Sequence, residues 1–440
     1  MKLPTNGRIV LVDNRYEEIS PIVDFLSRNR IPYNYFSGEM DKLPDNPTNS
    51  VRIIFLDLQI TEGSNPKLAI STVASILKRI VVVNPSPYII VAWSKHASED
   101  DYTSPLEELF KKGKILEKIA PVKILYLSKS DYMHFDTDID KWVLDEGGDI
   151  KLASDIPEKL SRQSVLLNFM QYENIVHDAT GELINYISSY NFDSNWNAET
   201  KTILYQLAKA IIGEEEIQSS SASQRLEKAL LLSNNILHEE IENLIKIRGL
   251  GDIDSITKGK VDQNAVIRLN TKIHLSKENS KSSILEQGNL FINKRKRTIV
   301  KQIIDQYVVI GRANELKQAY IKEILDDKPW ELMLDITPVC DYAQSKDYMR
   351  FIYGVALPKK HEEKIKSPGP VFLYSEKVVF EIEGQFRFFI FDFRKILSIP
   401  ISKFKKQGLS PNYKLRREIV TDIQAQLSNQ INRPGIGKVS

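Results

Sequence analysis

The sequence predicts an α/β protein that opens with a doubly wound five-stranded parallel sheet, continues with a helical region and closes with an α+β domain. Over the first 130 residues, short apolar runs rich in β-branched and aromatic residues alternate with amphipathic segments. This alternation is the pattern of a parallel sheet covered by helices. After residue 260, strand patterns dominate, which is typical of an α+β domain.

Five apolar segments are expected to form the N-terminal sheet. They are residues 8–13, 32–36, 51–57, 88–93 and 122–128. A helix is expected between the first two strands, because apolar residues recur there at i, i+3, i+4 and i+7. Two further helices are expected at 67–80 and 105–119, whereas 39–50 contains two prolines and is too short and broken for a full helix.

Domain boundaries are predicted near residues 150 and 250. The chain turns acidic and polar from Asp131 to Asp155, and Pro157 then opens a long helical pattern at the first-turn position that proline favours. Helical patterns continue to residue 248, interrupted only by a serine run. The predicted divisions are therefore residues 1–150, 151–250 and 251–440.

The last predicted helix of the middle region carries a repeated apolar seam. Its members recur at spacings of four, seven, four and three residues, and are Leu226, Leu230, Leu237, Ile241 and Leu244. Such a seam belongs to a packed or a self-associating helix. The repeat is too short to require a partner, so an intramolecular bundle and a homodimer both fit.

In the C-terminal region, residues 267–275 alternate apolar and polar side chains, which predicts a half-buried strand. Further strands are expected at 330–336, 349–357, 371–381 and 386–393, and a last amphipathic helix from Leu415 to Leu427. Polar residues after the 330–336 strand, including Asp341, indicate either a pocket or a capped turn.

Composition excludes several classes of protein. Sixty basic and 58 acidic residues give a net charge of +2, so nucleic-acid binding is not expected, and the basic run 294–297 precedes no helix-turn-helix pattern. The single cysteine, Cys340, excludes an internal disulfide. Neither a signal peptide nor a run of about 18 apolar residues occurs, so we expect a cytoplasmic protein without a membrane partner.

Polar residues close four of the five predicted N-terminal strands. Asp13 and Asn14 follow the first strand, Asp57 the third, Ser94 the fourth and Lys129 the fifth. The carboxyl ends of parallel strands meet at one edge of the sheet, where such folds bind their ligands. This ordered set is more specific than any single motif.

The set has the chemistry to transfer a phosphoryl group to a carboxylate. Mg²⁺ prefers oxygen ligands and keeps several waters, so Asp13, Asp57 and the backbone carbonyl near Gln59 suffice to hold it. Asp57 is then the nucleophile, because a carboxylate attacks once the charge of the incoming group is neutralised. Lys129 supplies positive charge, and Ser94 donates its hydroxyl to the attached phosphoryl group.

These residues, in this order, resemble the CheY-like receiver domain of bacterial two-component response regulators. The resemblance covers the first third of the chain and implies a flavodoxin-like fold, Mg²⁺ as cofactor and phosphorylation of Asp57 by a sensor histidine kinase. Tyr126, three residues before Lys129, matches the aromatic switch that turns inward when Ser94 moves. The implied response is a shift of the face around the fourth and fifth strands, read by a downstream effector protein.

The chain departs from the family's pattern in three features. Asn14 stands where a second acid is common, so it offers Mg²⁺ a carbonyl oxygen but lowers the expected metal affinity. Lys95 and His96 replace small residues after Ser94 and are expected to crowd the site, which slows attack of water on the acyl phosphate. The segments 58–87 and 95–121 are longer than usual.

Three functions fit the sequence. The first is a phosphorelay protein that acts as a switch or a phosphate sink. A receiver joined to a large region without a DNA-binding motif is similar to the response regulator of the bacterial Detocs anti-phage relay, which implies antiviral defence. The second is a scaffold whose receiver is not phosphorylated and mediates protein–protein interaction. The third is an effector whose C-terminal domain is an enzyme of an unrecognised kind.

Overall fold

The structure is a computed structural model. It describes residues 8–47, 50–61, 63–162, 164–188, 196–250, 262–277, 285–294, 298–307, 314–338, 341, 347–365, 371–373 and 378–431. By its internal contacts the chain divides into two compact units. The first is Met1–Lys209 with Ser220–Thr257, and the second is Ala210–Ser219 with Lys258–Ser440. Among the described residues, no helix is long and apolar enough to cross a membrane.

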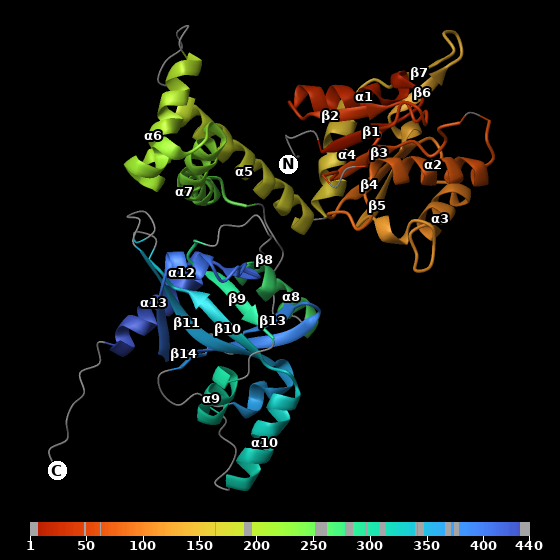
Figure 1. The fold of residues 1–440 in the computed structure, drawn as a ribbon. Helices are drawn as coiled ribbons and strands as arrows, with labels where there is room; N and C mark the ends of the chain where they lie inside the picture. Colours follow the sequence, from red (N-terminus) through yellow and green to blue (C-terminus); the bar gives the residue numbers. More distant parts are fainter. Residues whose placement is uncertain are drawn as a thin grey trace, which may run out of the picture. The chain divides into compact units, whose positions relative to one another are not determined.

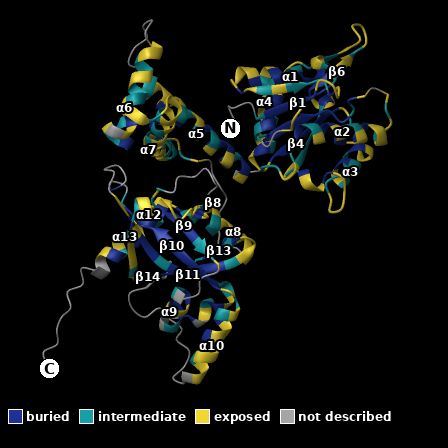
Figure 2. Cartoon of the chain, viewed as in Figure 1, coloured by how far each residue is buried: buried dark blue, intermediate teal, exposed yellow. Residues whose placement is uncertain are grey.

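The first unit contains a five-stranded, all-parallel sheet with the order β2-β1-β3-β4-β5 (Figure 1). Its strands are β1 (Ile9–Val12), β2 (Tyr33–Phe36), β3 (Ile53–Leu56), β4 (Ile89–Ser94) and β5 (Lys123–Ser128). The central strands β1, β3 and β4 are buried along their whole length, as Figure 2 shows, because both faces of the sheet are covered. The predicted α/β class and all five strand positions are confirmed.

Helices cover the two faces of this sheet. Alternate strand residues enter two apolar clusters, so that Val10 and Val12 face one side while Ile9 and Leu11 face the other. The first cluster is completed by α2 (Pro66–Ile80) and α3 (Asp100–Glu108), and the second by α1 (Tyr16–Arg28) and α4 (Gly148–Ser161). As predicted, the described residues between β2 and β3 form no helix.

Two helix predictions in this unit are wrong in their bounds. The predicted helix 105–119 is replaced by α3, which ends at Glu108, and by a short 3-10 turn, η1 (Glu117–Ile119). Gly113 lies between them with a φ of 81°, a left-handed conformation that ends helices. Pro157 does not open a helix either, because it lies inside α4, which accepts it at the loss of one backbone hydrogen bond.

The segment predicted as a domain boundary is structured. A hairpin of β6 (Met133–Asp136) and β7 (Lys141–Leu144) follows β5, and α4 begins directly after it. Residue 150 therefore lies within α4. This helix buries Leu152 and Ile156 against the parallel sheet, so it belongs to the sheet's own core.

The chain continues with helical segments, which confirm the predicted helical region. They are α5 (Ser164–Ser188), α6 (Trp196–Ser219), which is kinked at Gly213, and α7 (Ala222–Arg248). The start of α7 is fixed by a capping box of Ser221 and Gln224, where the predicted serine run interrupts the helices. α7 packs along α5. Leu226 and Leu230 of the predicted seam are exposed, so packing within one chain uses only part of it.

The beginning of α5 is tied to the parallel sheet. Leu166 and Met170 are buried in the same cluster as the strand residues of β1. Beside them, Glu173 accepts from Arg52, whose Nη2 lies 2.6 Å from Oε1, and it also pairs with Arg8 at 2.5 Å. The first turns of α5 thus contribute apolar side chains to the core of the sheet and an acid that pairs with Arg8 and Arg52.

The second unit is built on an antiparallel sheet with the order β12-β14-β11-β10-β9-β15-β8, and β13 pairs with β14. Its strands are β8 (Leu275–Lys277), β9 (Asn289–Asn293), β10 (Trp330–Asp335), β11 (Tyr348–Pro358), β12 (Val371–Leu373), β13 (Val379–Ile382), β14 (Gln385–Pro400) and β15 (Tyr413–Leu415). Its helices are α8 (Gln263–His274), α9 (Thr298–Tyr307), α10 (Asn314–Asp326), α12 (Ile401–Lys405) and α13 (Arg417–Ile431). The predicted α+β class of this region is confirmed. α13 packs on one apolar cluster of the sheet, whereas α9 and α10 pack on another.

The predicted strand at 267–275 is wrong, because these residues form most of α8. The helix begins at Asp262, whose side chain accepts from the backbone N–H of Asn264. It lies against strand β13, where Thr271 accepts the backbone N–H of Glu381 at 2.7 Å. This contact satisfies a donor of a strand more than a hundred residues later, and a local alternation pattern cannot predict it.

Of the polar segment after β10, the structure describes residues 336–338 and Asp341. Asp335 accepts the backbone N–H of Thr337 at 2.9 Å, and Asp341 pairs with Arg350 at 3.4 Å. Cys340 lies outside the described residues. The same holds for the basic run except Lys294, which pairs with Glu383.

Candidate functional site

Four predicted site residues meet at the carboxyl edge of the parallel sheet. Asp13 and Asp57 directly follow β1 and β3, Ser94 is the last residue of β4, and Lys129 follows β5. The parallel register aligns these strand ends, and all four residues are at most 5% exposed. We call these four residues, together with Glu18 of α1 that lies against Lys129, the edge site.

Lys129 is the centre of the edge site. Its Nζ lies 2.8 Å from Asp13 Oδ2, 3.3 Å from Asp57 Oδ2 and 2.6 Å from Oε2 of a further acid, Glu18. Burial favours the neutral amine, but the three carboxylates outweigh burial and hold the pKa of Lys129 above its ordinary value. The amine is therefore a fixed positive charge.

The edge site has more negative than positive groups. Three buried carboxylates share one ammonium, and burial raises the pKa of Asp13 to about 7, with the charge of Asp57 adding to this and Lys129 opposing it. Oxygens of Asp13, Glu18 and Asp57 lie within 4.8 Å of one another. An all-oxygen set with excess negative charge has the donor chemistry that Mg²⁺ requires. These residues thus fit the predicted ion.

A cavity of about 190 Å³ opens onto the edge site. Its lining is mostly polar, and consists of Asn14, Arg15, Glu18, Asp57, Gln59, Gly63 and Lys95. Backbone N–H groups orient the acids at its floor, because Gln59 donates to Asp57 Oδ1 at 3.2 Å and Arg15 donates to Asp13 Oδ1 at 2.9 Å. Asp57 is therefore held in a defined orientation facing a space that a small anion can enter.

Of the two residues after Ser94, Lys95 lines this cavity. The His96 ring bridges two loops, with Nε2 2.8 Å from Gln59 Oε1 and Nδ1 2.8 Å from Glu99 Oε1. The ring also stacks on Tyr102 at a centroid distance of 4.4 Å. His96 is thereby fixed beside Gln59, which lines the cavity.

Tyr126 lies outside the edge site. It is half-buried on β5, and its hydroxyl donates to Glu107 Oε1 of α3 at 3.1 Å. The backbone carbonyl of Tyr126 accepts from Lys159 of α4 at 3.3 Å. At Tyr126, strand β5 is thus hydrogen-bonded to α3 and to α4.

No protein-family model matches this chain, and no curated protein matches it.

Glu18 is the residue of this site that sequence reasoning missed. It lies in the first turn of α1 and is 4% exposed. A signal was present, since Glu18 stands four residues before Ile22 and thus on the apolar stripe that predicts the helix. An acid on the buried face of a helix is rarely there without a partner.

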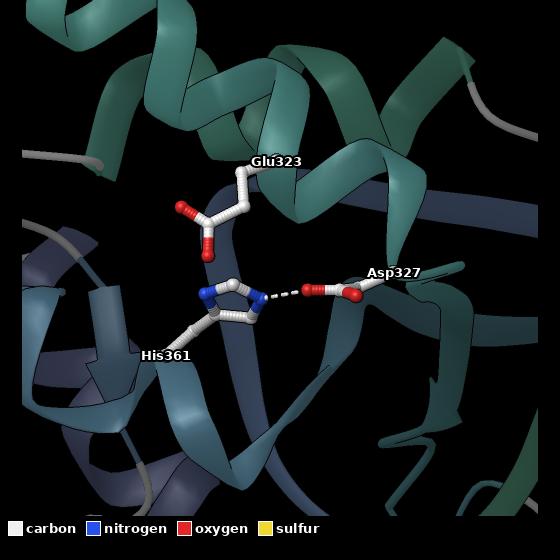
Figure 3. A group of neighbouring side chains, drawn as sticks. All are labelled: Glu323, Asp327 and His361. Atoms are coloured by element: carbon white, nitrogen blue, oxygen red, sulfur yellow. Dashed lines mark hydrogen bonds and ion pairs between the residues drawn. The ribbon is translucent and has the colours of Figure 1, made fainter.

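A second cluster of titratable residues lies in the C-terminal unit, and sequence reasoning missed it as well. His361 is fully buried, with Nδ1 2.8 Å from Tyr320 Oη. Its Nε2 lies 2.6 Å from Oδ2 of Asp327, which directly follows α10 (Figure 3). Glu323, in the last turn of α10, points toward the same ring (Figure 3). Lys360 pairs with Asp327 at 2.7 Å and holds the pKa of that carboxyl below its ordinary value. Both nitrogens of the buried ring are satisfied and the acid is neutralised, so this network stabilises the fold.

Binding of a divalent cation at the edge site is expected to release a proton. Because the pKa of Asp13 is raised to about 7, part of this carboxyl is protonated at neutral pH and must ionise to hold the ion. The apparent affinity for Mg²⁺ should therefore increase from about pH 6 to about pH 8, by at most about tenfold per pH unit. Titration calorimetry in two buffers of different ionisation enthalpy measures the proton directly.

In the metal-free protein, the Asp13 carboxyl is expected to make the free energy of unfolding decrease as pH rises. A carboxyl whose folded pKa exceeds its unfolded value of 3.8 binds more protons in the fold, so stability decreases as pH rises from about 4 to about 7. Added Mg²⁺ should reverse this slope. An affinity that is flat or that falls with pH contradicts the assignment of Asp13 to the metal site.

Proposed function

We propose that the N-terminal domain is a CheY-like receiver that accepts a phosphoryl group on Asp57 from a sensor histidine kinase in the cytoplasm. The observation that supports it is the position of Asp57, buried at the end of a central strand. Its Oδ2 lies 3.3 Å from Lys129 Nζ, Asp13 shares that same ammonium, and a polar cavity opens above it. Acid, cation and cavity are the parts that phosphoryl transfer to a carboxylate needs.

In the proposed reaction, an oxygen of Asp57 attacks the phosphorus of a phosphohistidine. The new P–O bond forms as the P–N bond breaks, and the imidazole nitrogen leaves with the bonding pair and takes up a proton. Gln59 N–H holds one carboxylate oxygen of Asp57, while Lys129 faces the other and neutralises charge on the transferred group. Asp13, Asp57, the carbonyl oxygen of Asn14 and the backbone carbonyl near Gln59 would hold Mg²⁺, which would supply further charge neutralisation.

Ser94 connects the phosphoryl group to the rest of the domain. Its buried Oγ accepts the backbone N–H of His96 at 3.3 Å, so a rotation toward the phosphoryl group alters the loop that contains His96. For Tyr126 to turn inward, its hydroxyl must leave Glu107. The Lys159 contact to the Tyr126 carbonyl then carries the change into α4. A coupling of about 1 to 3 kcal/mol is ordinary for such switches.

The output of this switch is a proposal taken from the resemblance alone. Either a downstream effector protein reads the shifted face, or the domain serves as a phosphate sink for its kinase. A role in antiviral defence is likewise taken from the resemblance, whereas a homodimer rests on the apolar seam of α7, and an enzymatic C-terminal domain is an alternative to the phosphorelay. The identity of the neighbouring genes is the simplest observation that separates them.

The direct test is phosphorylation by a small phosphodonor. Incubated with acetyl phosphate and Mg²⁺, the full-length chain is expected to gain one phosphoryl group, because the donor fits the cavity without a partner protein. Intact-mass spectrometry measures the gain. A parallel sample with chelator should gain none, since the carboxylates then lack the cation that offsets the charge of the donor. Absence of any gain with Mg²⁺ favours the unphosphorylated scaffold instead.

A further inference from the structure

The edge site contains an acid that the receiver pattern does not include. Asn14, at the end of β1, provides no negative charge where a second acid is common. Yet Glu18 places a buried carboxylate at the same cavity, which both residues line, from the first turn of α1. The site therefore keeps three carboxylates although one position of the sequence pattern has lost its acid.

Glu18 is held in place by contacts to its backbone carbonyl and to both of its carboxylate oxygens. The Trp93 indole N–H donates to its backbone carbonyl at 2.9 Å in the core. Its Oε2 lies 2.6 Å from Lys129 Nζ, and its Oε1 lies 3.4 Å from Arg15 Nη1. These contacts with Trp93, Lys129 and Arg15 fix the position of the Glu18 carboxylate beside the cavity.

The charges around Glu18 argue for a second cation in the site. A buried carboxylate is stable only when it is paired, and the Lys129 ammonium is already shared with Asp13 and Asp57. Arg15 lines the same cavity, with 39% of its side chain exposed, and its Nη1 faces the other carboxylate oxygen, Oε1. A divalent ion among the three acids supplies the missing positive charge.

We propose that Glu18 is the second acid of the metal site, contributing from α1 the negative charge that Asn14 does not contribute from β1. This inference rests on the proposed receiver function. With Mg²⁺ bound, Glu18 gives one oxygen to the ligands around the ion, directly or through a bound water, and Lys129 is released toward Asp57 and the incoming phosphoryl group. The Mg²⁺ affinity is therefore not expected to be low merely because Asn14 replaces an acid.

Titration calorimetry with Mg²⁺ on the full-length chain tests this. Glu18→Gln, which keeps the shape and removes the charge, should lower the Mg²⁺ affinity by about 10- to 100-fold. Glu17→Gln is the matched control, because Glu17 is the exposed neighbour in the same helical turn, and its affinity should equal that of wild type. The double variant Asn14→Asp with Glu18→Gln moves the acid to β1 and should recover wild-type affinity.

The outcomes separate this inference from the proposed function. If wild type binds no Mg²⁺, the receiver proposal itself fails. If wild type binds but Glu18→Gln binds equally well, Glu18 serves only as a partner of Lys129, and this inference is overturned while the receiver proposal stands. Should Glu18→Gln not fold, as judged by circular dichroism, the single variant Asn14→Asp decides. An Mg²⁺ affinity close to that of wild type supports Glu18 as the acid already present in the site, whereas an affinity at least about tenfold higher overturns this inference.

Discussion

Replacing Asp57 with asparagine is expected to abolish phosphoryl uptake completely. An amide cannot form the acyl phosphate, and the proposed transfer needs the carboxylate that Gln59 N–H and Lys129 hold below the cavity. The variant should also be at least as stable as wild type, because it removes one of three carboxylates that repel each other around a single ammonium. A loss of function together with unchanged or higher stability is a combination that misfolding cannot produce.

Intact mass after incubation with acetyl phosphate and Mg²⁺ measures the first effect, and urea unfolding without metal measures the second. Glu17→Gln, which removes an exposed acid from the same unit, should label like wild type. Undiminished labelling of Asp57→Asn shows that another residue is the acceptor. A strong loss of stability shows that Asp57 has a structural role instead.

Lys129→Met is expected to be the most destabilising single change at the edge site. It removes the ammonium that Asp13, Glu18 and Asp57 share and leaves these acids buried without it. Loss of one partner from a buried ion pair costs about 3 to 5 kcal/mol in the free energy of unfolding. Lower pH should recover part of the loss, since protonation removes the repulsion, and Mg²⁺ should do the same at neutral pH if the acids hold it.

The matched control is Lys123→Met, on the same strand β5 but exposed to solvent. It should change the free energy of unfolding by no more than about 0.5 kcal/mol. Urea unfolding at pH 7 in the presence of chelator compares the two. Equal effects of the two substitutions contradict the view that Lys129 balances the charge of the site.

The parallel sheet was predictable because its signals are local. Each strand is a short apolar run buried on both faces, and Asp13, Asp57 and Lys129 stand directly where a run stops. Since strand ends meet by the geometry of the fold, a position in sequence was enough to place these groups together. Glu18 was not predictable in this way, because only the packing of α1 over the sheet brings its carboxylate to Lys129.

The second unit was less predictable because its order depends on pairing between distant segments. β15 pairs with β8, which aligns Tyr413 with Lys277, and no local pattern encodes that choice. The His361 network likewise joins residues from α10 and from the segment after β11. In α8, Leu269 and Ile273 are apolar but exposed to solvent. Together with the buried apolar residues they produce an alternation of apolar and polar residues that is typical of a strand, although the buried residues alone recur with the helical period.

The attachment of α5 to the parallel sheet limits how evolution and protein engineering can recombine this chain. Signalling modules are exchanged by gene fusion when a domain ends where its core ends. Here a cut at residue 150 divides α4, removes Leu166 and Met170 from the sheet's core and leaves the guanidinium groups of Arg8 and Arg52 without Glu173. A transplantable unit must extend beyond Glu173, into a helix that already belongs to the next region. A substitution at this junction therefore acts on the sheet and on the helical region together.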